Sequence, residues 1–299
     1  MTSFLFTSDL HGNVGQYRAA FRSATDENVA SIVIGGDIAP YLERSSHANQ
    51  RAFLEETLPR LVERECRVPL FLMLGNDDAA INLDLLERRH GALWQHMQGR
   101  RLPFINGYEI VGYPWVPISP FGIKDYEKFD HKPRKAKKGV HTFFSGEEIM
   151  GPGASLDGWV SMANGWHPIH FDTKRVGRTI EEDLQDGLFT DNPAKTVCCF
   201  HSPPYGGPLD VIGHPLHVGS RAIAEFIEQR QPAFALSGHI HETVEMSSIY
   251  AYKIGTAVCA AAGNDPRSDR LAYLIVGLGG ECLVERKTVP VSSAKPQSI

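Results

Sequence analysis

Short apolar runs alternate with helical patterns in the first half of the chain. Residues 3–8, 31–36 and 69–75 read "SFLFTS", "SIVIGG" and "PLFLMLG". Continuous apolar runs of this length, bounded by Gly, Pro or polar residues, are typical of strands buried on both faces. Residues 14–24 and 47–65, which lie between these runs, have helical spacing of their apolar positions. This alternation predicts right-handed crossovers and a mostly parallel sheet.

The second half repeats the pattern and then changes. Residues 195–200 ("KTVCCF") and 233–238 ("AFALSG") are further candidates for buried strands, and residues 220–229 between them are a candidate helix. The C-terminal part then offers strand candidates without helices, and Gly279-Gly280 between two apolar runs predicts a hairpin turn. A chain that begins in this way and ends in antiparallel strands predicts the α/β fold class, with two sheets packed together.

Residues 115–180 interrupt this rhythm. They include "HKPRKAKKG" at 131–139 and the Gly/Trp-rich stretch at 151–168, and neither shows a clear periodicity. A long irregular segment inside a compact domain is usually a functional loop, a lid or a mobile segment. The positive charges between Lys132 and Lys138 are typical of a solvated loop, with phosphate contact as the alternative reading.

Length, charge and cysteine content limit the class of protein. The 299 residues, 42% of them hydrophobic, suffice for a substantial core, and we predict a single domain over 1–290, with the insertion, and a tail at 291–299. The formal net charge of −5 argues against a general binder of nucleic acids or membrane surfaces. Five cysteines without paired spacing, no signal-peptide pattern and no membrane-spanning apolar run predict a cytoplasmic protein with reduced thiols. Homo-oligomer formation stays open.

Metal-capable side chains follow each of the five predicted buried strands. The carboxyl ends of parallel strands share one edge, where open α/β sheets bind their ligands, so we expect these side chains on one side of one sheet. A lone histidine at a strand end is more often structural than a metal ligand, but coincidence at five strand ends indicates a site. The residues are Asp9 and His11, Asp37, Asn76 with Asp77 and Asp78, His201, and His239 with His241.

The types of side chain narrow the chemistry. Imidazole nitrogens with carboxylate and amide oxygens suit Mn, Fe, Zn, Co or Ni better than a dedicated Ca or Mg cage. Seven ligands are too many for one tetrahedral zinc, but they fit two metal ions if one carboxylate bridges them. Two metals roughly 3.5–4 Å apart can deprotonate a bridging water and hold both oxygens of an in-line phosphoryl displacement. The set therefore predicts hydrolysis of a small-molecule phosphate ester.

In order and spacing, these motifs resemble the calcineurin-like metallophosphoesterase superfamily. The family pattern of D-x-H, G-D, G-N-H-[DE], a lone His and G-H-x-H matches Asp9-Leu10-His11, Gly36-Asp37, Gly75-Asn76-Asp77-Asp78, His201 and Gly238-His239-Ile240-His241. The resemblance, over residues 3–242, implies a four-layer α/β/β/α sandwich of two mixed β-sheets. It further implies that Asp9, His11 and His241 hold one metal, that Asn76, His201 and His239 hold the other, and that Asp37 bridges the two.

One position departs from the family pattern. The family usually has a histidine after the asparagine, credited with stabilising or protonating the leaving group, and here that residue is Asp77. An ionised Asp77 cancels the one positive charge that two divalent ions keep beside Asp9, Asp37 and a bridging hydroxide. A charge about 5 Å from the phosphoryl group shifts its energy by on the order of 3 kcal/mol. This opposes a dianionic monoester more than a monoanionic diester.

The resulting hypothesis is a phosphodiesterase that uses a metal-bridging hydroxide, favours good leaving groups and belongs to a prokaryotic phosphodiesterase-like branch. The softer matches at 179–184 and 217–227 resemble that branch. A carboxylate near two cations is a poor acid, so His214 and His217 are alternative proton donors, and exposed loop histidines are the competing reading. Two other functions remain: a non-catalytic protein-binding scaffold of the same fold, as in the retromer subunit, and a nuclease helped by the basic run.

Overall fold

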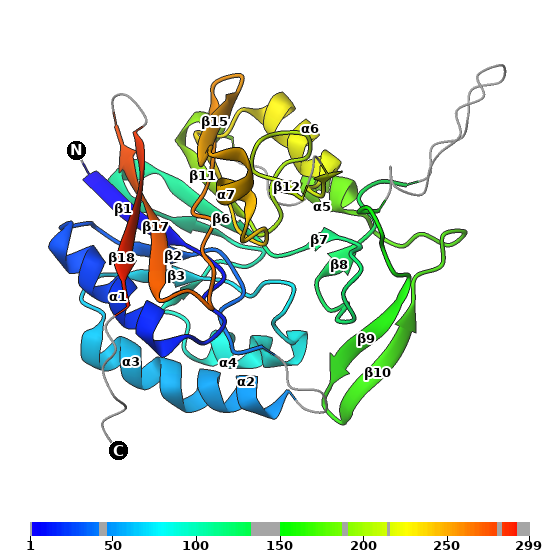
Figure 1. Cartoon of the computed structure of the whole chain (residues 1–299), viewed down its shortest axis with the longest axis horizontal. Helices are drawn as coiled ribbons and strands as arrows, with labels where there is room; N and C mark the ends of the chain where they lie inside the picture. The colour runs from blue at the N-terminus through cyan, green and yellow to red at the C-terminus, as the bar shows by residue number, and fades with distance from the viewer. Residues whose placement is uncertain are drawn as a thin grey trace.

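The structure, a computed structural model, describes residues 2–41, 47–132, 150–186, 191–213, 216–279 and 283–291. Two six-stranded mixed sheets organise these residues (Figure 1). The first sheet has the order β18-β17-β1-β2-β3-β4, in which β1 to β4 are parallel and β17 and β18 are antiparallel. Its strands are β1 (Thr2–Thr7), β2 (Ile32–Ile34), β3 (Leu70–Leu72), β4 (Gln95–His96), β17 (Arg270–Leu278) and β18 (Val284–Pro290).

The second sheet has the order β15-β16-β14-β11-β6-β5. Its four central strands are parallel, and β15 and β5 pair antiparallel at the two edges. Its strands are β5 (Arg101–Pro103), β6 (Glu109–Tyr113), β11 (Thr196–Phe200), β14 (Phe234–Ser237), β15 (Ala251–Ile254) and β16 (Ala257–Ala261). The two mixed sheets confirm the predicted α/β fold class.

Successive side chains of a strand point to opposite faces of its sheet, so each sheet face packs into a different buried apolar cluster. Phe4 and Phe6 of β1 share an apolar cluster with Val197 of β11 and Leu236 of β14, so the sheets pack face to face. Leu5 points the other way and packs with the helices that cover the first sheet. A third cluster joins the outer face of the second sheet to α5 and α6. Figure 1 shows α1 to α4 on one side of the molecule and α5 and α6 on the opposite side.

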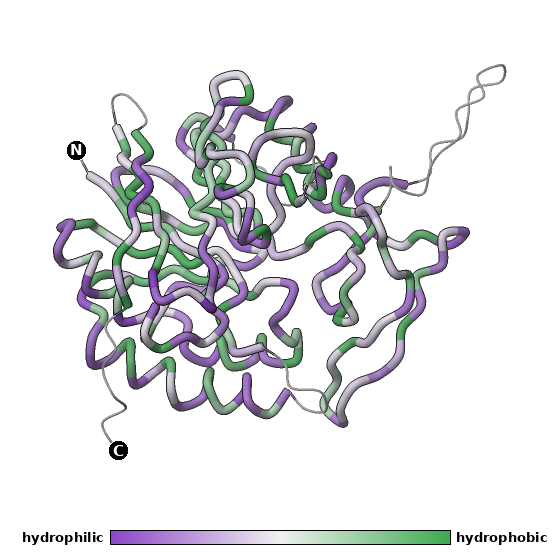
Figure 2. The backbone as a smooth tube through the Cα atoms, in the orientation of Figure 1, coloured by the Kyte–Doolittle hydropathy of each residue, from purple (hydrophilic) through white to green (hydrophobic). Residues whose placement is uncertain are grey.

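The helices are mostly short. The α-helices are α1 (Val14–Asp26), α2 (Ala48–Ala52), α3 (Leu58–Glu65), α4 (Leu83–Arg88), α5 (Ile180–Asp186), α6 (Arg221–Arg230) and α7 (Thr243–Ser247), and single 3-10 turns cover Ala80–Asn82, Ile105–Gly107 and Pro193–Lys195. The side chains of Asn13 and Ser220 accept the capping hydrogen bonds at the starts of α1 and α6. Figure 2 shows hydrophobic residues concentrated in the strands of both sheets.

The predicted helix over residues 47–65 is continuous but contains a π-helical turn, Phe53–Thr57, between α2 and α3. Pro59 follows this turn and lacks the N–H that would bind the carbonyl of Glu55. The Arg89 guanidinium donates to that carbonyl instead, at 2.8 Å. The apolar face still points to the core, since Leu54 and Leu58 are fully buried.

The prediction that five strand ends meet at one edge of a single sheet is wrong. β1, β2 and β3 belong to the first sheet, whereas β11 and β14 belong to the second. Local apolar patterns identify each strand, but pairing between strands depends on where the chain crosses over. The strand ends still meet, because the two sheets pack against each other: the His201 imidazole contacts the carbonyl of Gly35 after β2, and the backbone N–H of His239 after β14 donates to Asp9 Oδ1 after β1.

The predicted irregular segment at 115–180 contains regular structure. β7 (Val116–Pro117) pairs with β8 (Glu127–Lys128), and β9 (Asp157–Met162) forms an antiparallel hairpin with β10 (Gly165–His170) that projects from the body in Figure 1. The turn residues are Ala163 and Asn164, and Gly165 opens β10; the sequence Asn164-Gly165 is a hairpin signal that the sequence analysis missed. The basic run from residue 133 onward lies outside the described residues.

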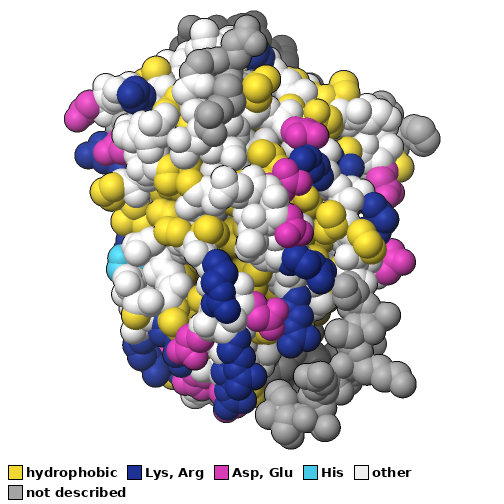
Figure 3. All heavy atoms as spheres, turned by 90° about the vertical axis from the view of Figure 1, so that its left-hand side faces the viewer, with side chains coloured by type: hydrophobic (Ala, Val, Ile, Leu, Met, Phe, Trp, Pro, Cys, Tyr) yellow, Lys and Arg dark blue, Asp and Glu magenta, His cyan; other side chains and the backbone are white. Residues whose placement is uncertain are grey.

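The surface and the thiols agree with the composition. No helix within the described ranges is long and apolar enough to cross a membrane. Positive and negative side chains are interspersed on the face shown in Figure 3. The four described cysteines, Cys66, Cys198, Cys199 and Cys259, are free.

Candidate metal centre

The backbone is strained where the proposed ligands lie. Asp9, His11, Asp37 and His239 have φ values of 57°, 40°, 50° and 68°. Positive φ is uncommon for residues with a side chain, and these are four of the eight such non-glycine residues in the described ranges. Strain of this kind persists where the surrounding structure enforces it and clusters at functional sites. The strand-end turns are thus shaped to aim their side chains.

Glycines allow the turns to approach one another closely. A Cβ atom at Gly75 would lie 2.3 Å from Asp37 Oδ1 and 2.7 Å from His201 Cε1. A Cβ atom at Gly238 would lie 2.7 Å from Asp9 Oδ2. No side chain fits at such distances, so these positions require glycine if the carboxylates and the imidazole are to converge.

Asp9, His11 and His241 form the first group of converging ligand atoms. One atom from each lies within 4.8 Å of the others, and His241 Nε2 is 3.8 Å from Asp9 Oδ1. Both ring nitrogens of His11 are buried and have no hydrogen-bond partner among the described residues. Buried polar atoms normally have a partner, so an imidazole in this state fits a metal ligand. The resemblance assigns this same trio to one metal.

Asp37 lies between that group and the second one. Its Oδ2 is 3.5 Å from His11 Nε2 and 3.3 Å from His201 Nε2. His201 Nδ1 bonds to the carbonyl of Gly35 at 2.9 Å, which leaves Nε2 directed at Asp37 and at Asn76 Oδ1, 3.0 Å away. A hydrogen bond on one ring nitrogen of this kind orients a metal-binding histidine.

The resemblance adds His239 to the second group, and the structure places its ring beside His201. The ring centroid of His239 is 5.4 Å from that of His201, and the backbone N–H of His239 donates to Asp9 Oδ1 at 3.0 Å. Atoms that bind one metal at about 2.0–2.2 Å lie roughly 3–4 Å apart, which matches the separations around Asp37. The donor set therefore fits two transition-metal ions. Asp9, His11 and His241 would hold one, Asn76, His201 and His239 the other, and Asp37 both.

The adjacent carboxylates Asp77 and Asp78 have different positions. Asp78 accepts the backbone N–H groups of Ile38, Ala39 and Gly75 at 2.9–3.0 Å, so it ties the turn after β3 to the turn after β2. The Asp77 carboxylate joins His11 and Asp37 in a third group of atoms within 4.8 Å, and it accepts from Asn76 Nδ2 at 3.2 Å. One carboxylate is structural and the other faces the centre.

The pKa values of the groups in the centre are shifted by burial and by the neighbouring charged groups. Burial alone would raise the pKa of Asp37, yet His201 and His11 hold it well below its usual range. Burial lowers the pKa of His239 to about 3. Burial also acts to lower the pKa of His201, but Asp37, Asp9 and the carbonyl of Gly35 together outweigh it and raise that pKa to about 10. Without metal, burial and the neighbouring carboxylates of Asp37 and Asp78 raise the pKa of Asp77 to about 8.

We expect the metal-free protein to lose stability as the pH rises from about 6.5 to about 8. Burial raises the pKa of Asp77 to about 8 and that of Asp78 to about 7, whereas an unfolded aspartate titrates near ~3.9. Over this interval the folded state holds protons that the unfolded chain has released. Each such proton lowers the free energy of unfolding by up to about 1.4 kcal/mol for every pH unit that the pH rises. His201, with a pKa of about 10, acts in the same direction.

Thermal melting in a chelator measures this effect. A Tm that rises over this interval contradicts the expectation. Melting with a divalent transition metal is the control, because metal ions compete with these protons and should reduce or reverse the fall.

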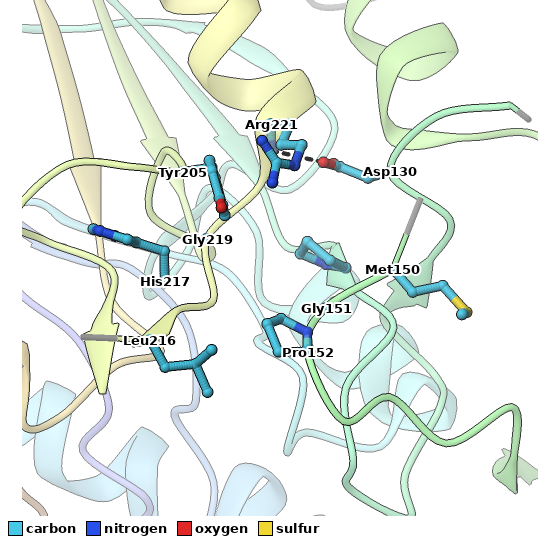
Figure 4. A pocket seen from close by; sticks show the side chains of 10 residues that line it. Asp130, Met150, Gly151, Pro152, Tyr205, Leu216, His217, Gly219 and Arg221 are labelled. Carbon is cyan, nitrogen blue, oxygen red and sulfur yellow. Dashed lines mark hydrogen bonds between the residues drawn. The ribbon is translucent and has the colours of Figure 1, made fainter. Parts of the chain in front are cut away.

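Of the two histidines predicted as alternative proton donors, His214 lies outside the described residues. His217, on β13 (Leu216–His217), which pairs with β12 (Val211–Ile212), is not among the converging groups. Its Nδ1 contacts the buried Asp210 at 2.7 Å. It lines a pocket of about 150 Å³ with Tyr205 and Arg221, whose guanidinium lies 3.5 Å from the Tyr205 ring centroid (Figure 4). A role for His217 as proton donor stays a prediction.

Several supporting residues carry no sequence signal of their own. Asn264 donates to the carbonyls of Ser8 and Asp9 and to Gln16, and it accepts from Ala272, which fixes the turn after β1. Gln50 binds the carbonyl of Asp77 at 2.7 Å. Both are buried amides far along the chain from the turns that they hold, so only the structure reveals them.

Comparison with protein families decides the assignment. The model of the calcineurin-like phosphoesterases matches residues 2–243. The chain belongs to this family. Membership makes the protein a phosphoric ester hydrolase of a family that depends on two metal ions, in agreement with the two converging groups. A comparison with curated proteins gave no match.

Solved structures share the fold of this calcineurin-like phosphoesterase. TT1561 of Thermus thermophilus is 14% identical with a TM-score of 0.57, and the match covers 97% of this chain and 99% of that one. A dimetal phosphatase from Danio rerio is 15% identical with a TM-score of 0.52 and the same coverage. Likeness at such low identity shows the fold alone.

Proposed function

We propose that this calcineurin-like phosphoesterase is a phosphodiesterase that hydrolyses small phosphate diesters with two bound transition-metal ions. One observation carries the choice of diester: the carboxylate of Asp77 lies with His11 and Asp37 in a cluster whose ligand atoms are within 4.8 Å of one another. Where the family usually has a neutral or positive imidazole, this centre has a carboxyl group, which two bound cations would keep ionised. A dianionic monoester is repelled more strongly by that group than a monoanionic diester.

The protein groups in this centre bind and orient the reactants. Bound metal ions would neutralise phosphate charge and lower the pKa of a water molecule that attacks phosphorus. Asp37 would be the ligand that the two ions share, and the hydrogen bond from His201 Nδ1 to the carbonyl of Gly35 fixes the imidazole that faces it. The Asn76 side chain donates from Nδ2 to Asp77, which leaves its Oδ1 directed at His201 Nε2. A good leaving group suits this site, because ionised Asp77 has no proton to donate near two cations.

Replacing Asp77 with histidine tests the proposal. We expect the wild type, loaded with Mn, Zn or Co, to hydrolyse an aryl diester faster than the matching aryl monoester. Asp77→His should lower the ratio of the two kcat/KM values roughly 10- to 100-fold, since about 1.4 kcal/mol corresponds to a factor of ten. Asp77→Asn is the matched control, because it removes the charge without adding an imidazole and should shift the ratio in the same direction.

The outcomes separate the parts of the proposal. A wild type that already prefers the monoester refutes the charge argument while leaving a two-metal hydrolase intact. Bound metal with no metal-dependent turnover of either ester would refute the hydrolase and favour a protein-binding scaffold. Elemental analysis of each variant shows whether the metal content changed as well.

A further inference from the structure

Two exposed aromatic side chains flank the metal centre. The Tyr41 ring stacks on His11, with ring centroids 3.9 Å apart and an angle of 15° between the planes. The Phe121 ring meets His239 edge-on, with centroids 6.5 Å apart and an angle of 86°. His11 and His239 belong to the two different groups of proposed ligands, so one aromatic ring borders each half of the centre.

Both rings remain available to a ligand. Tyr41 is 43% exposed and Phe121 is 53% exposed, although each touches a largely buried cluster of charged groups. A single exposed aromatic residue is ordinary on a protein surface. Here the two rings contact two different histidines of one polar centre, and each ring is partly exposed beside it.

The turn that presents Phe121 is rigidly built. The Phe121 N–H donates to Ser119 Oγ at 3.1 Å, and the Trp159 N–H on β9 donates to the carbonyl of Gly122 at 2.8 Å. Beneath the turn, Lys124 Nζ donates to the carbonyl of Ser119 at 2.8 Å and to Glu127 Oε2 at 2.6 Å. Both charged side chains of this pair are fully buried. These bonds fix the backbone that carries Phe121 before a ligand arrives, so little ordering of the turn is needed on binding.

We propose that Tyr41 and Phe121 bind the organic groups of the substrate, and that the substrate is therefore a diester carrying flat aromatic groups. The inference rests on the proposed phosphodiesterase function. A phosphodiester has one organic group on each of two oxygens, and the two rings offer an apolar surface on each side of the centre. Aromatic groups gain from offset or edge-on contact with such rings, whereas a methyl or glycerol group gains much less.

A pair of substrates with the same leaving group isolates this effect. Phenyl 4-nitrophenyl phosphate and methyl 4-nitrophenyl phosphate both release 4-nitrophenolate and differ only in the group that stays on phosphorus. We expect the wild-type holoenzyme to prefer the phenyl ester in kcat/KM. Tyr41→Ala or Phe121→Ala should reduce that preference about 3- to 10-fold, mainly through KM, because stacking contacts between aromatic groups are of that size.

Matched variants distinguish packing from other causes. Tyr41→Phe keeps the ring and should keep the preference, whereas Met246→Ala removes an apolar side chain that is 48% exposed on α7 and should change nothing. Metal content measured for each variant identifies any loss of metal, since Tyr41 touches His11. Calorimetric binding of methyl(phenyl)phosphinate and dimethylphosphinate, which are monoanions like a diester and have no ester bond to hydrolyse, repeats the comparison without turnover.

The results distinguish a failure of the ring assignment from a failure of the proposed phosphodiesterase function. Hydrolysis with an unchanged phenyl-to-methyl ratio in both alanine variants overturns the assignment of the rings and leaves the phosphodiesterase standing. A loss in Tyr41→Phe equal to that in Tyr41→Ala overturns it for Tyr41, because the hydroxyl would then be responsible. If neither diester is hydrolysed with any metal, the proposed function fails. In that case, equal binding of the two phosphinates by the wild type would overturn the inference as well.

Discussion

Asp37→Asn is expected to remove most of the metal-dependent activity and to lower the metal content below two ions per chain. Asp37 Oδ2 lies 3.3 Å from His201 Nε2 and 3.5 Å from His11 Nε2, so we propose it as the carboxylate that the two ions share. Loss of a residue that merely supports a metal ligand typically costs 10- to 100-fold in affinity or activity. Loss of a shared ligand should therefore cost more than about 100-fold in kcat/KM. Elemental analysis and hydrolysis of an aryl diester measure both effects.

The amide variant is suited to this test because Asn retains the oxygen that accepts the Asp77 N–H, at 2.9 Å in the wild type. The turn should consequently keep its shape. Asp157→Asn is the matched control, since it disrupts another aspartate–histidine pair, at 2.8 Å from His170, on the exposed hairpin. Two ions per chain and near-normal turnover in Asp37→Asn would refute the proposed centre.

Lys124→Met is expected to destabilise the protein by about 3–5 kcal/mol. The Lys124 and Glu127 side chains are fully buried and bound to each other, so removing the ammonium group leaves a carboxyl group in the interior without its cation. Burial raises the pKa of Glu127 to about 7 even with Lys124 beside it. Without Lys124 the pKa should rise further, and the destabilisation should therefore grow between pH 6 and pH 8. Urea unfolding at both pH values provides the measurement.

The double variant Lys124→Met/Glu127→Gln provides the comparison. An amide at position 127 can still accept the Ser119 N–H, at 3.0 Å in the wild type, without carrying a charge. We expect the double variant to recover more than half of the stability lost in the single one. A double variant as unstable as the single variant would show that packing, and not the unpaired carboxyl group, accounts for the loss.

Sequence reasoning located the strands and the residues at their ends because both signals are local. An apolar run such as residues 69–75 identifies a buried strand by itself, and the polar residues that follow it need no knowledge of the partner strands. The assignment of β11 to a second sheet depends on long-range pairing, which no local pattern contains. The prediction of a single sheet was wrong for that reason.

The remaining differences have the same origin. Asp78 resembles Asp77 in sequence, but its three backbone partners lie in turns from two strands, so its structural role appears only once those turns meet. Tyr41 and Phe121 are ordinary aromatic residues until folding brings them against His11 and His239. By contrast, Asn164-Gly165 is a local hairpin signal that could have been found.

The position of β1 between β2 and β17 has a consequence for biosynthesis. As a ribosome releases the chain from its N-terminus, β1 emerges early but can pair along one edge only, until β17 emerges some 260 residues later. The turn that carries Asp9 likewise waits for Asn264. A nascent chain should therefore be unable to capture its metal ions, and the cofactor should be acquired only when translation is almost complete.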